Sequence, residues 1–409
     1  MNPASRIRSA VALVSLLFVI LFSTVRNDAR PATWSTPEVR VIVLEGTPYN
    51  RGLMHGRALK KEINEVIRKW KAHVESDYKM AADLFIDRFL KETNFLPAIK
   101  RWTPDLLDEV KGIADGSGVV FNAILLIQLG DEEWVNAQYI APEHCSGLGV
   151  NRQGARPAMV AQNMDIEGFY NPYQVVLQIK HKDSDLQSLV FTCAGMLGLN
   201  GMNNRSIGVC VNTLSQLSHA KEGLPVTFVI RGLLEQRTQK DAIRFLHQVK
   251  HASGQNYIIG GPEKVYDFEA SSNKVVEYRP SKDSQVVYHT NHALANDDMN
   301  AEFRARFAKL EASKRRTGNT FSRFESLEKR LSGDTVSVNA ETFKAALRSH
   351  DSEKDPVCVP YRDEKRVMTF GSVIMILSAK PELLVTAGPP DKSDYTTVSF
   401  AGRAEVAKK

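Results

Sequence analysis

One cysteine stands out by its neighbours. Cys145 lies in the stretch "EHCSGLGV", directly after His144 and before a Ser-Gly pair. A thiol at the start of a strand can act as a nucleophile if a base takes its proton and donors hold the developing oxyanion. Cleavage between His144 and Cys145 would create such a base, an α-amino group with an ordinary pKa of about 7.7–8.0. The alternative interpretation makes Cys145 an ordinary buried thiol.

The other cysteines do not form a metal-binding pattern. Cys193, Cys210 and Cys358 lack CxxC spacing and no HExxH motif occurs, so the sequence predicts no zinc site and no cofactor. Cys193 and Cys210 lie in apolar runs, where a free thiol packs as a small hydrophobic group. We expect Cys358 to be structural.

The order of motifs around Cys145 resembles a known family. After the cysteine come "AQNMDIEGFY", "GMNNRSIGVCVNTLS", "HTNHAL" and "FRARF", with "RGLMHGRAL" upstream. In this order they are similar to the acyl-coenzyme A:6-aminopenicillanic acid acyltransferase family, whose members are self-processing N-terminal-nucleophile (Ntn) hydrolases. The resemblance covers most of residues 40–400. It implies an α+β fold of four αββα layers, a helical pro-chain ending at His144, and a catalytic chain beginning at Cys145.

The resemblance also implies roles for an aspartate and an arginine. Asp165 in "QNMD", twenty residues after Cys145, matches the family aspartate that orients the α-amino group. The structural alternative is an aspartate that caps a turn at the end of a strand. Arg304 in "FRARF" matches the family arginine near the active centre, although Arg306 is two residues away and a solvent-facing helical arginine is the third alternative.

Two asparagines complete the implied site. Asn291 in "HTNH" matches the side-chain donor to the oxyanion, and Asn212 in "VCVNTL" matches the second polar group that faces the acyl carbonyl. For Asn212 the alternative is a polar residue that ends a strand. A different mechanism would pair the thiol with a histidine as base, with His144, His289 or His292 as candidates.

Hydrophobic patterning divides the chain near the same cysteine. Residues 34–144 are predicted to be mainly helical, after a short strand at 39–46 and a Gly-rich turn that contains His55. One apolar stripe at helical spacing consists of Leu59, Ile63, Ile67, Trp70 and Val74. From Cys145 to the end (145–409), runs of strands with grouped helices predict layered α+β packing. We expect low order in residues 23–36, 313–325 and the last few positions.

The N-terminal sequence and the charge indicate where the protein is located and which partners it binds. Arg6 and Arg8 precede an apolar run at residues 10–22, which predicts that residues 1–33 are an export signal, or an uncleaved membrane anchor, with a linker. We therefore expect a periplasmic or secreted protein. The net charge of +6 is spread in short clusters, so nucleic-acid binding has little support.

These features predict an exported, self-processing cysteine hydrolase that cleaves the amide bonds of N-acyl compounds or small peptides through an acyl-enzyme. Outside the cell acyl-CoA is an improbable donor, which favours hydrolysis over the alternative of acyl transfer to an amine. A second alternative is an unprocessed, non-catalytic binding protein. After processing, we expect the two chains to stay associated.

Overall fold

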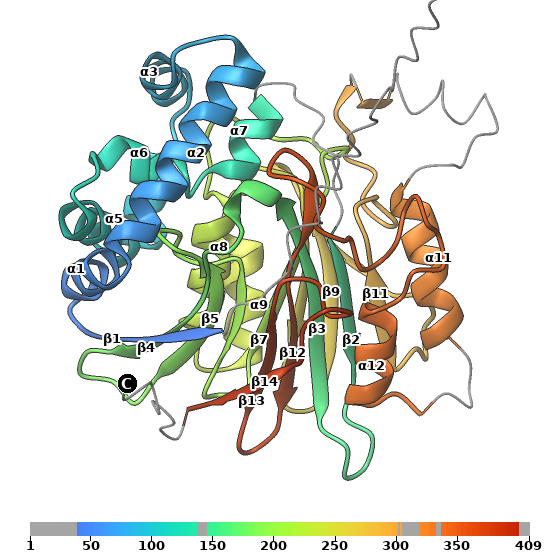
Figure 1. Cartoon of the computed structure of the whole chain (residues 1–409). Coiled ribbons are helices and arrows are strands. Elements are labelled where there is room, and N and C mark those ends of the chain that lie inside the picture. Colours follow the sequence, from blue (N-terminus) through green and yellow to red (C-terminus); the bar gives the residue numbers. More distant parts are fainter. Residues whose placement is uncertain (1–38, 137–144, 302, 305–318, 333–336, 401–409) are drawn as a thin grey trace, which may run out of the picture. The chain divides into compact units, whose positions relative to one another are not determined.

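Two β-sheets form the centre of this computed structural model, which describes residues 39–136, 145–301, 303–304, 319–332 and 337–400 (Figure 1). The eight-stranded sheet has, in spatial order, β1 (Arg40–Gly46), β4 (Gln174–His181), β5 (Gln187–Cys193), β6 (Asn200–Asn203), β7 (Gly208–Thr213), β8 (Gln255–Gly260), β9 (Val265–Ala270) and β10 (Val275–Tyr278). The six-stranded sheet has β11 (Val286–His289), β2 (Ser146–Val150), β3 (Ala158–Glu167), β12 (Val367–Leu377), β13 (Glu382–Ala387) and β14 (Thr396–Ser399).

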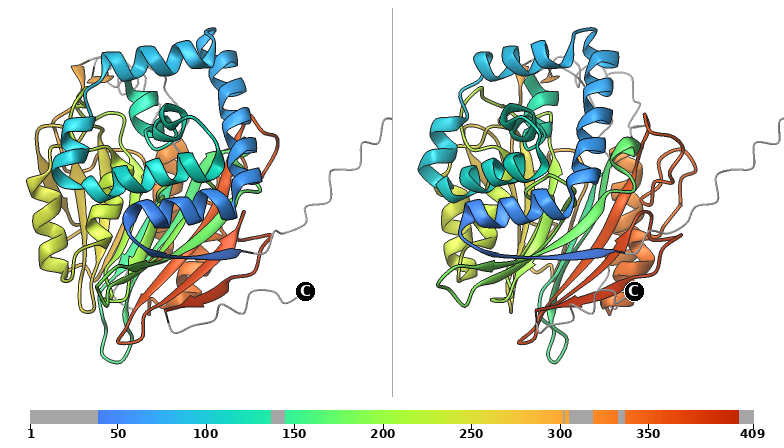
Figure 2. Two further views of the ribbon diagram at one scale, coloured as in Figure 1. Left: turned by 90° about the vertical axis from the view of Figure 1, so that its left-hand side faces the viewer. Right: turned by 60° about the vertical axis from the view of Figure 1, so that its left-hand side comes forward.

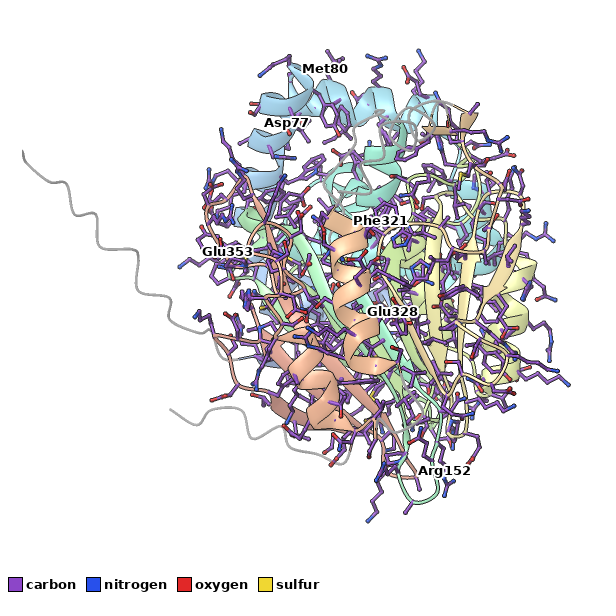
Figure 3. All side chains as sticks on the ribbon, turned by 90° about the vertical axis from the view of Figure 1, so that its right-hand side faces the viewer. Asp77, Met80, Arg152, Phe321, Glu328 and Glu353 are labelled. Carbon is purple, nitrogen blue, oxygen red and sulfur yellow. The ribbon has the colours of Figure 1, made fainter. Side chains whose placement is uncertain are left out.

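The sheets are stacked and helices cover their outer faces (Figure 2). Strands β2 and β3 contact β7, β8 and β9 across the interface between the sheets. Helices α8 (Val226–Leu234) and α9 (Gln239–Gln248) pack on β6, β7 and β8, while α11 (Asn319–Leu331) and α12 (Ala340–Leu347) pack on β11, β3 and β12. Figure 3 looks onto α11, with Phe321 and Glu328 labelled along it. The four-layer αββα fold of the α+β class is thereby confirmed.

The described residues before Cys145, 39–136, form a mainly helical region, while the predicted end of a pro-chain at His144 stays a prediction. Its helices are α1 (Pro48–Ala58), α2 (Lys60–Tyr78), α3 (Ala82–Glu92), α4 (Leu96–Trp102), α5 (Pro104–Ser117), α6 (Phe121–Leu126), α7 (Gly130–Asn136). The predicted apolar stripe on α2 is buried, as amphipathic packing requires. The predicted strand is present as β1, and it pairs in parallel with β4 at the edge of the eight-stranded sheet. The helical region thus also supplies a strand to the core.

The predicted Gly-rich turn around His55 is instead helix α1. Thr47 caps its first turn by accepting a hydrogen bond from the Asn50 backbone, and Pro48 occupies the first helical position. Glycines let α1 approach α5 closely, because a Cβ added at Gly52 would lie 1.9 Å from the Glu109 carbonyl oxygen. The glycine spacing therefore serves helix–helix contact, which sequence reasoning took for turn formation.

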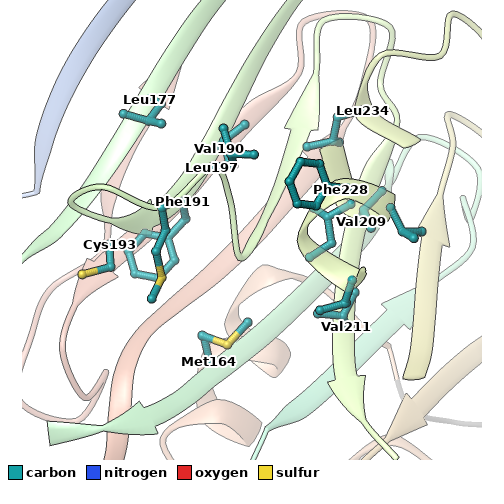
Figure 4. Packing of buried hydrophobic residues seen from close by; sticks show 14 of the residues in the cluster. Met164, Leu177, Val190, Phe191, Cys193, Leu197, Val209, Val211, Phe228 and Leu234 are labelled. Carbon is teal, nitrogen blue, oxygen red and sulfur yellow. The ribbon is translucent and has the colours of Figure 1, made fainter. Parts of the chain in front are cut away.

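The interface between the sheets is a continuous apolar core. Figure 4 shows Met164 of β3 and Phe191 of β5 in this layer, whereas Val209 and Val211 of β7 lie on the other face of the eight-stranded sheet, beside Phe228 of α8. All four cysteines are free and buried, and Cys193 and Cys210 belong to this core as predicted. No helix within the described ranges is long and apolar enough to cross a membrane. The predicted export segment, residues 1–33, lies outside those ranges.

One segment expected to have low order is helical. Helix α11 begins at Asn319, inside the predicted low-order range 313–325, whereas residues 305–318 lie outside the described part of the chain. The buried face of α11 consists of Arg323, Ser326, Leu327 and Leu331, at helical spacing. The Ser- and Arg-rich composition concealed this amphipathic pattern.

Candidate active site

Cys145 lies directly before β2, an inner strand of the six-stranded sheet. Its side chain is 8% exposed, and its Sγ lies 3.7 Å from the backbone oxygen of Asp165. The antiparallel register of β2 and β3 pairs Ser146 with Asn163, which brings the start of β2 to the end of β3 where Asp165 lies. Burial, and next the Asp165 carboxyl, raise the pKa of the Cys145 thiol well above its usual range. The thiol is therefore protonated and needs a base before it can attack.

Asp165 is a buried carboxyl that lacks a matching donor. It is 5% exposed, and neither carboxylate oxygen has a hydrogen bond of normal geometry from the described residues. Burial raises the pKa of Asp165 to about 8, although Thr369 and Arg323 favour the ionised form. A buried carboxylate without donors is costly. An amino group created at Cys145 would supply the missing donor, as expected of the aspartate that orients the α-amine.

Arg323 connects the nucleophile to a second part of the site. It is fully buried, and its Nη1 donates to the Cys145 carbonyl oxygen at 2.5 Å and to Ser146 Oγ at 3.0 Å. Its Nη2 donates to Asn291 Oδ1 at 2.9 Å. One guanidinium thus holds the start of β2 and the candidate oxyanion donor in a fixed relation, which suits the rigid fork of arginine.

Asn291 is oriented as a donor. Arg323 occupies its Oδ1, while its Nδ2 donates to the Thr213 carbonyl oxygen at 3.0 Å. The backbone amide of Asn291 donates to Thr320 Oγ1 at 2.8 Å. Nδ2 carries two hydrogens and makes one hydrogen bond among the described residues, so the second hydrogen can serve a substrate carbonyl. The geometry is compatible with the oxyanion role, which stays a prediction.

Asn212 is near the site but its donors are engaged. Its Nδ2 donates to Asn256 Oδ1 at 3.1 Å and to the His289 carbonyl oxygen at 3.2 Å. A Cβ added at Gly147 on β2 would lie 3.2 Å from the same Nδ2. Both hydrogens of Nδ2 are therefore assigned to protein acceptors, and this arrangement favours a role in joining strands. Its role opposite the acyl carbonyl stays a prediction.

Arg304 does not lie at the centre formed by these residues. Its side chain is exposed, and its Nη2 donates to the Asp297 carbonyl oxygen at 3.4 Å. The alternative, Arg306, lies outside the described residues. The arginine beside Cys145 is Arg323, which sequence reasoning missed. Its place among the apolar positions of α11 is the signal that would have found it, because an arginine on a buried helical face requires polar partners.

The structure gives no support to a histidine base from the two described candidates. Both ring nitrogens of His289 have other partners, Thr290 O at 2.7 Å and Glu269 Oε1 at 2.9 Å. His292 Nδ1 lies 2.9 Å from Thr320 Oγ1. The hydrogen bonds of Cys145 Sγ within the described residues go to Met164 and Asp165, and neither partner is a histidine. The third candidate, His144, lies outside those residues.

Cys358 has hydrogen-bond partners other than Cys145, Asp165, Asn291 and Arg323. Its thiol donates to Asp391 Oδ1 at 3.2 Å, and His350 Nε2 lies 3.2 Å from the other oxygen of that carboxylate. The three ligand-type atoms lie within 4.8 Å of one another, an arrangement that these hydrogen bonds explain. The partners of Cys358 agree with its expected structural role.

Two stacked sheets between helical layers, with Cys145 directly before an inner strand, define an αββα protein. Residues 150–391 match the family model "Acyl-coenzyme A:6-aminopenicillanic acid acyl-transferase", and the chain belongs to this family.

Individual relatives are distant. The chain is 23% identical over 360 residues to the Emericella nidulans "Acyl-coenzyme A:6-aminopenicillanic-acid-acyltransferase 40 kDa form", a match that covers 87% of this chain and 95% of the relative. Protein dcd1A of Dictyostelium discoideum is 24% identical over 226 residues, 48% of this chain and half of that protein. A mutant of conjugated bile acid hydrolase from Clostridium perfringens aligns with a TM-score of 0.43 at 15% identity, covering 63% of this chain and 92% of that chain.

The raised pKa of Asp165 predicts how the stability of the fold changes with pH. The ordinary pKa of this carboxyl is near 3.8 and its pKa in the folded chain is about 8, so the folded chain keeps the proton up to a higher pH than the unfolded chain does. Between these values the unfolded chain binds fewer protons, so this residue makes the fold less stable as pH rises. In an uncleaved Cys145→Ala background, Asp165→Asn should therefore raise stability more at pH 8 than at pH 5, by at least about 1 kcal/mol. Thermal melts at both pH values measure this difference, and equal gains at the two pH values would contradict it.

Proposed function

We propose that this chain is a self-processing cysteine amidohydrolase that acts on N-acyl compounds or small peptides. The observation that carries the proposal is the convergence of a buried thiol at Cys145, the Asp165 carboxyl, whose oxygens accept no hydrogen bond of normal geometry from the described residues, and Arg323, which holds both Cys145 and Asn291. Membership of an acyltransferase family supports acyl chemistry at this centre. Acyl transfer to an amine is the alternative, because a relative that matches over most of the chain is named an acyltransferase.

Processing would begin with an attack by Cys145 Sγ on the carbonyl carbon of residue 144. A thioester forms, the peptide C–N bond breaks, and the nitrogen of Cys145 takes up the proton that the thiol gives off, which makes it a free amine. Water then hydrolyses the thioester, which returns the thiol and leaves a carboxylate at residue 144. Asp165, now beside an amino group, gains the donor that it lacks in the uncleaved chain.

Turnover would repeat this chemistry on a substrate. The α-amino group of Cys145 takes the thiol proton, sulfur attacks the acyl carbon, and the Asn291 amide donates to the oxyanion. Collapse of the intermediate expels the amine, protonated by the α-ammonium group, and leaves an acyl-enzyme. Water hydrolyses the acyl-enzyme to the carboxylic acid and the free thiol.

The cleaved chains would stay together through buried contacts. Glu109 of α5 accepts hydrogen bonds from Arg231 Nη1 at 2.8 Å and from Arg51 Nε at 3.2 Å, and all three side chains are at most 3% exposed. Gln128 Oε1 accepts from the Leu197 backbone at 2.7 Å. Together with the β1–β4 pairing, the Glu109–Arg231 and Gln128–Leu197 hydrogen bonds join residues on both sides of position 144. We further propose export, on the basis of the N-terminal pattern alone.

Hydrolysis of N-acyl substrates is tested on the processed protein with a panel of N-acyl amino acids, β-lactams and acyl-homoserine lactones. Release of the free acid identifies hydrolysis. Formation of a new amide when a second amine is added identifies transfer. A processed protein that releases no acyl group from any member of the panel would contradict the proposal, and an intact, inactive chain would favour a binding role.

Asn291 provides a residue-level test. Asn291→Ala should leave a folded, processed protein whose turnover is lower by on the order of 10²–10³, the usual loss for one oxyanion donor. Asn151→Ala is the matched control, because its side chain contacts Val265 and Gln285 at the far end of β2. Steady-state kinetics on both variants measure the effect. Turnover of Asn291→Ala within a few-fold of the wild type would remove Asn291 from the site.

A further inference from the structure

A buried ion pair joins the two sheets next to Asn291. His289 Nε2 lies 2.9 Å from Glu269 Oε1, and both side chains are fully buried. Nδ1 of the same imidazole lies 2.7 Å from the Thr290 carbonyl oxygen. Because both ring nitrogens face acceptors, both carry a proton and the imidazole is positively charged. Glu269 belongs to β9 of the eight-stranded sheet and His289 to β11 of the six-stranded sheet.

The Glu269 carboxylate also binds backbone amides of the loop that follows β11. Its oxygens accept hydrogen bonds from the backbone amides of Leu294 at 2.5 Å, Ala295 at 2.9 Å and Asn296 at 2.6 Å. The Asn296 side chain adds a hydrogen bond to the Glu269 carbonyl oxygen at 3.0 Å. Residues 290–296, which we call the Asn291 loop, are thus tied at their far end to one carboxylate. Asn291 lies within this loop.

The same pair reaches the nucleophile strand. His289 of β11 is paired directly with Gly147 of β2. Gly147 lies two residues after Cys145 in the sequence. The His289 carbonyl oxygen accepts a hydrogen bond from Asn212 Nδ2 at 3.2 Å. Displacement of His289 would therefore move the Asn291 loop relative to β2.

The electrostatics of the pair argue against a role in stability alone. Burial opposes both charges, yet Asp267 and Glu269 raise the pKa of His289, and His289 with the loop amides lowers the pKa of Glu269. A buried ion pair is often no more stabilising than apolar residues of the same volume, because both charges lose their hydration. Burying the Glu269–His289 pair costs hydration free energy, and its hydrogen bonds go to the Asn291 loop. We therefore explain the pair by the position in which it holds that loop.

We infer that Glu269 is a positioning residue for turnover: paired with His289, it holds the Asn291 loop so that the Asn291 amide faces the carbonyl attacked by Cys145. Glu269 contributes no atom to the substrate and acts through Asn291. The inference rests on the proposed function, in which Asn291 is the oxyanion donor.

The test compares Glu269→Gln with Glu109→Gln. Both remove a charge from a fully buried, ion-paired carboxylate, but Glu109 contacts Arg51 and Arg231, remote from the Asn291 loop. In Glu269→Gln an NH₂ group meets loop amides that need an acceptor. We expect its kcat to fall by about 10- to 100-fold with KM within about 3-fold, because small misplacements of a catalytic group are costly. Glu109→Gln should lower Tm and keep kcat within about 3-fold. Equal kcat values for the two variants would overturn the inference.

A double-mutant cycle separates this inference from the proposed function. If Glu269 acts through Asn291, Glu269→Gln combined with Asn291→Ala should lose no more turnover than Asn291→Ala alone. Losses that multiply would overturn the inference while leaving Asn291 as donor. A normal kcat for Asn291→Ala would instead contradict the proposed function.

A measurement independent of activity completes the test. Hydrogen exchange at the amides of Leu294, Ala295 and Asn296 should be faster in Glu269→Gln than in the wild type, and unchanged in Glu109→Gln. Unaltered protection in Glu269→Gln would contradict the anchoring of the loop by Glu269.

If Glu269→Gln does not fold, Asn296→Ala is the second variant, because it removes a side-chain hydrogen bond to the Glu269 backbone. It should show a smaller loss of kcat with the same unchanged KM, and a wild-type kcat would count against the inference.

Discussion

Replacing Cys145 with alanine should leave the chain uncleaved and abolish turnover, a loss of about 10⁴-fold or more. The alanine side chain has no nucleophile to form the thioester, so no amino group is released at position 145. The substitution itself is mild, because the side chain is 8% exposed and alanine removes one sulfur atom from a buried position. Denaturing gels and mass spectrometry report cleavage, and release of acyl groups reports turnover.

The matched control is Cys193→Ala. Cys193 is fully buried on β5 within the core between the sheets, so its loss removes the same sulfur atom from a comparable environment. This variant should be cleaved and active, with at most a lowered Tm. Cleavage of Cys145→Ala at the same bond would show that another group starts the reaction, and would remove Cys145 as the nucleophile.

Replacing Arg323 with lysine should impair both processing and turnover. Lysine keeps the charge but cannot reach the Cys145 carbonyl, Ser146 Oγ and Asn291 Oδ1 together, as the guanidinium does. We expect slow processing and turnover reduced by on the order of 10²–10³, since both the nucleophile strand and the oxyanion donor lose a fixed partner. Rates of cleavage and of turnover are measured separately, because the substitution affects both.

Arg231→Lys is the control for burying a lysine in place of an arginine. Arg231 is also fully buried, and it pairs with Glu109 away from Cys145. Its replacement should lower Tm at least as much as Arg323→Lys does, with turnover of the folded protein retained. If Arg323→Lys and Arg231→Lys lose turnover equally, the role assigned to Arg323 is one of stability.

Much of the fold could be predicted because its periodicities are local. The strand β1 and the amphipathic helix α2 follow patterns that their own residues carry. Short strands such as β6, four residues long, and β14 carry too little pattern and form because neighbouring strands supply hydrogen bonds. The α1 helix was mistaken for a turn because its glycines serve contact with α5, a partner about 50 to 60 residues away in the sequence.

The candidate site was harder to predict than the fold. Cys145 and Asp165 are close because β2 and β3 are paired, and family motifs pointed to both. Arg323 comes to Cys145 from α11, 178 residues later, in a segment whose composition indicated low order. The motif that carries Arg304 therefore drew attention away from Arg323, the arginine that contacts Cys145. Long-range contacts of this kind depend on how layers stack, which no single window of sequence contains.

The N-terminal sequence of the larger fragment of the purified wild-type protein tests whether Cys145 becomes an N-terminal residue. We expect the active protein to consist of two fragments, the larger of which begins Cys-Ser-Gly-Leu-Gly, residues 145–149. An active protein that remains a single chain, or whose larger fragment begins at another residue, would contradict it.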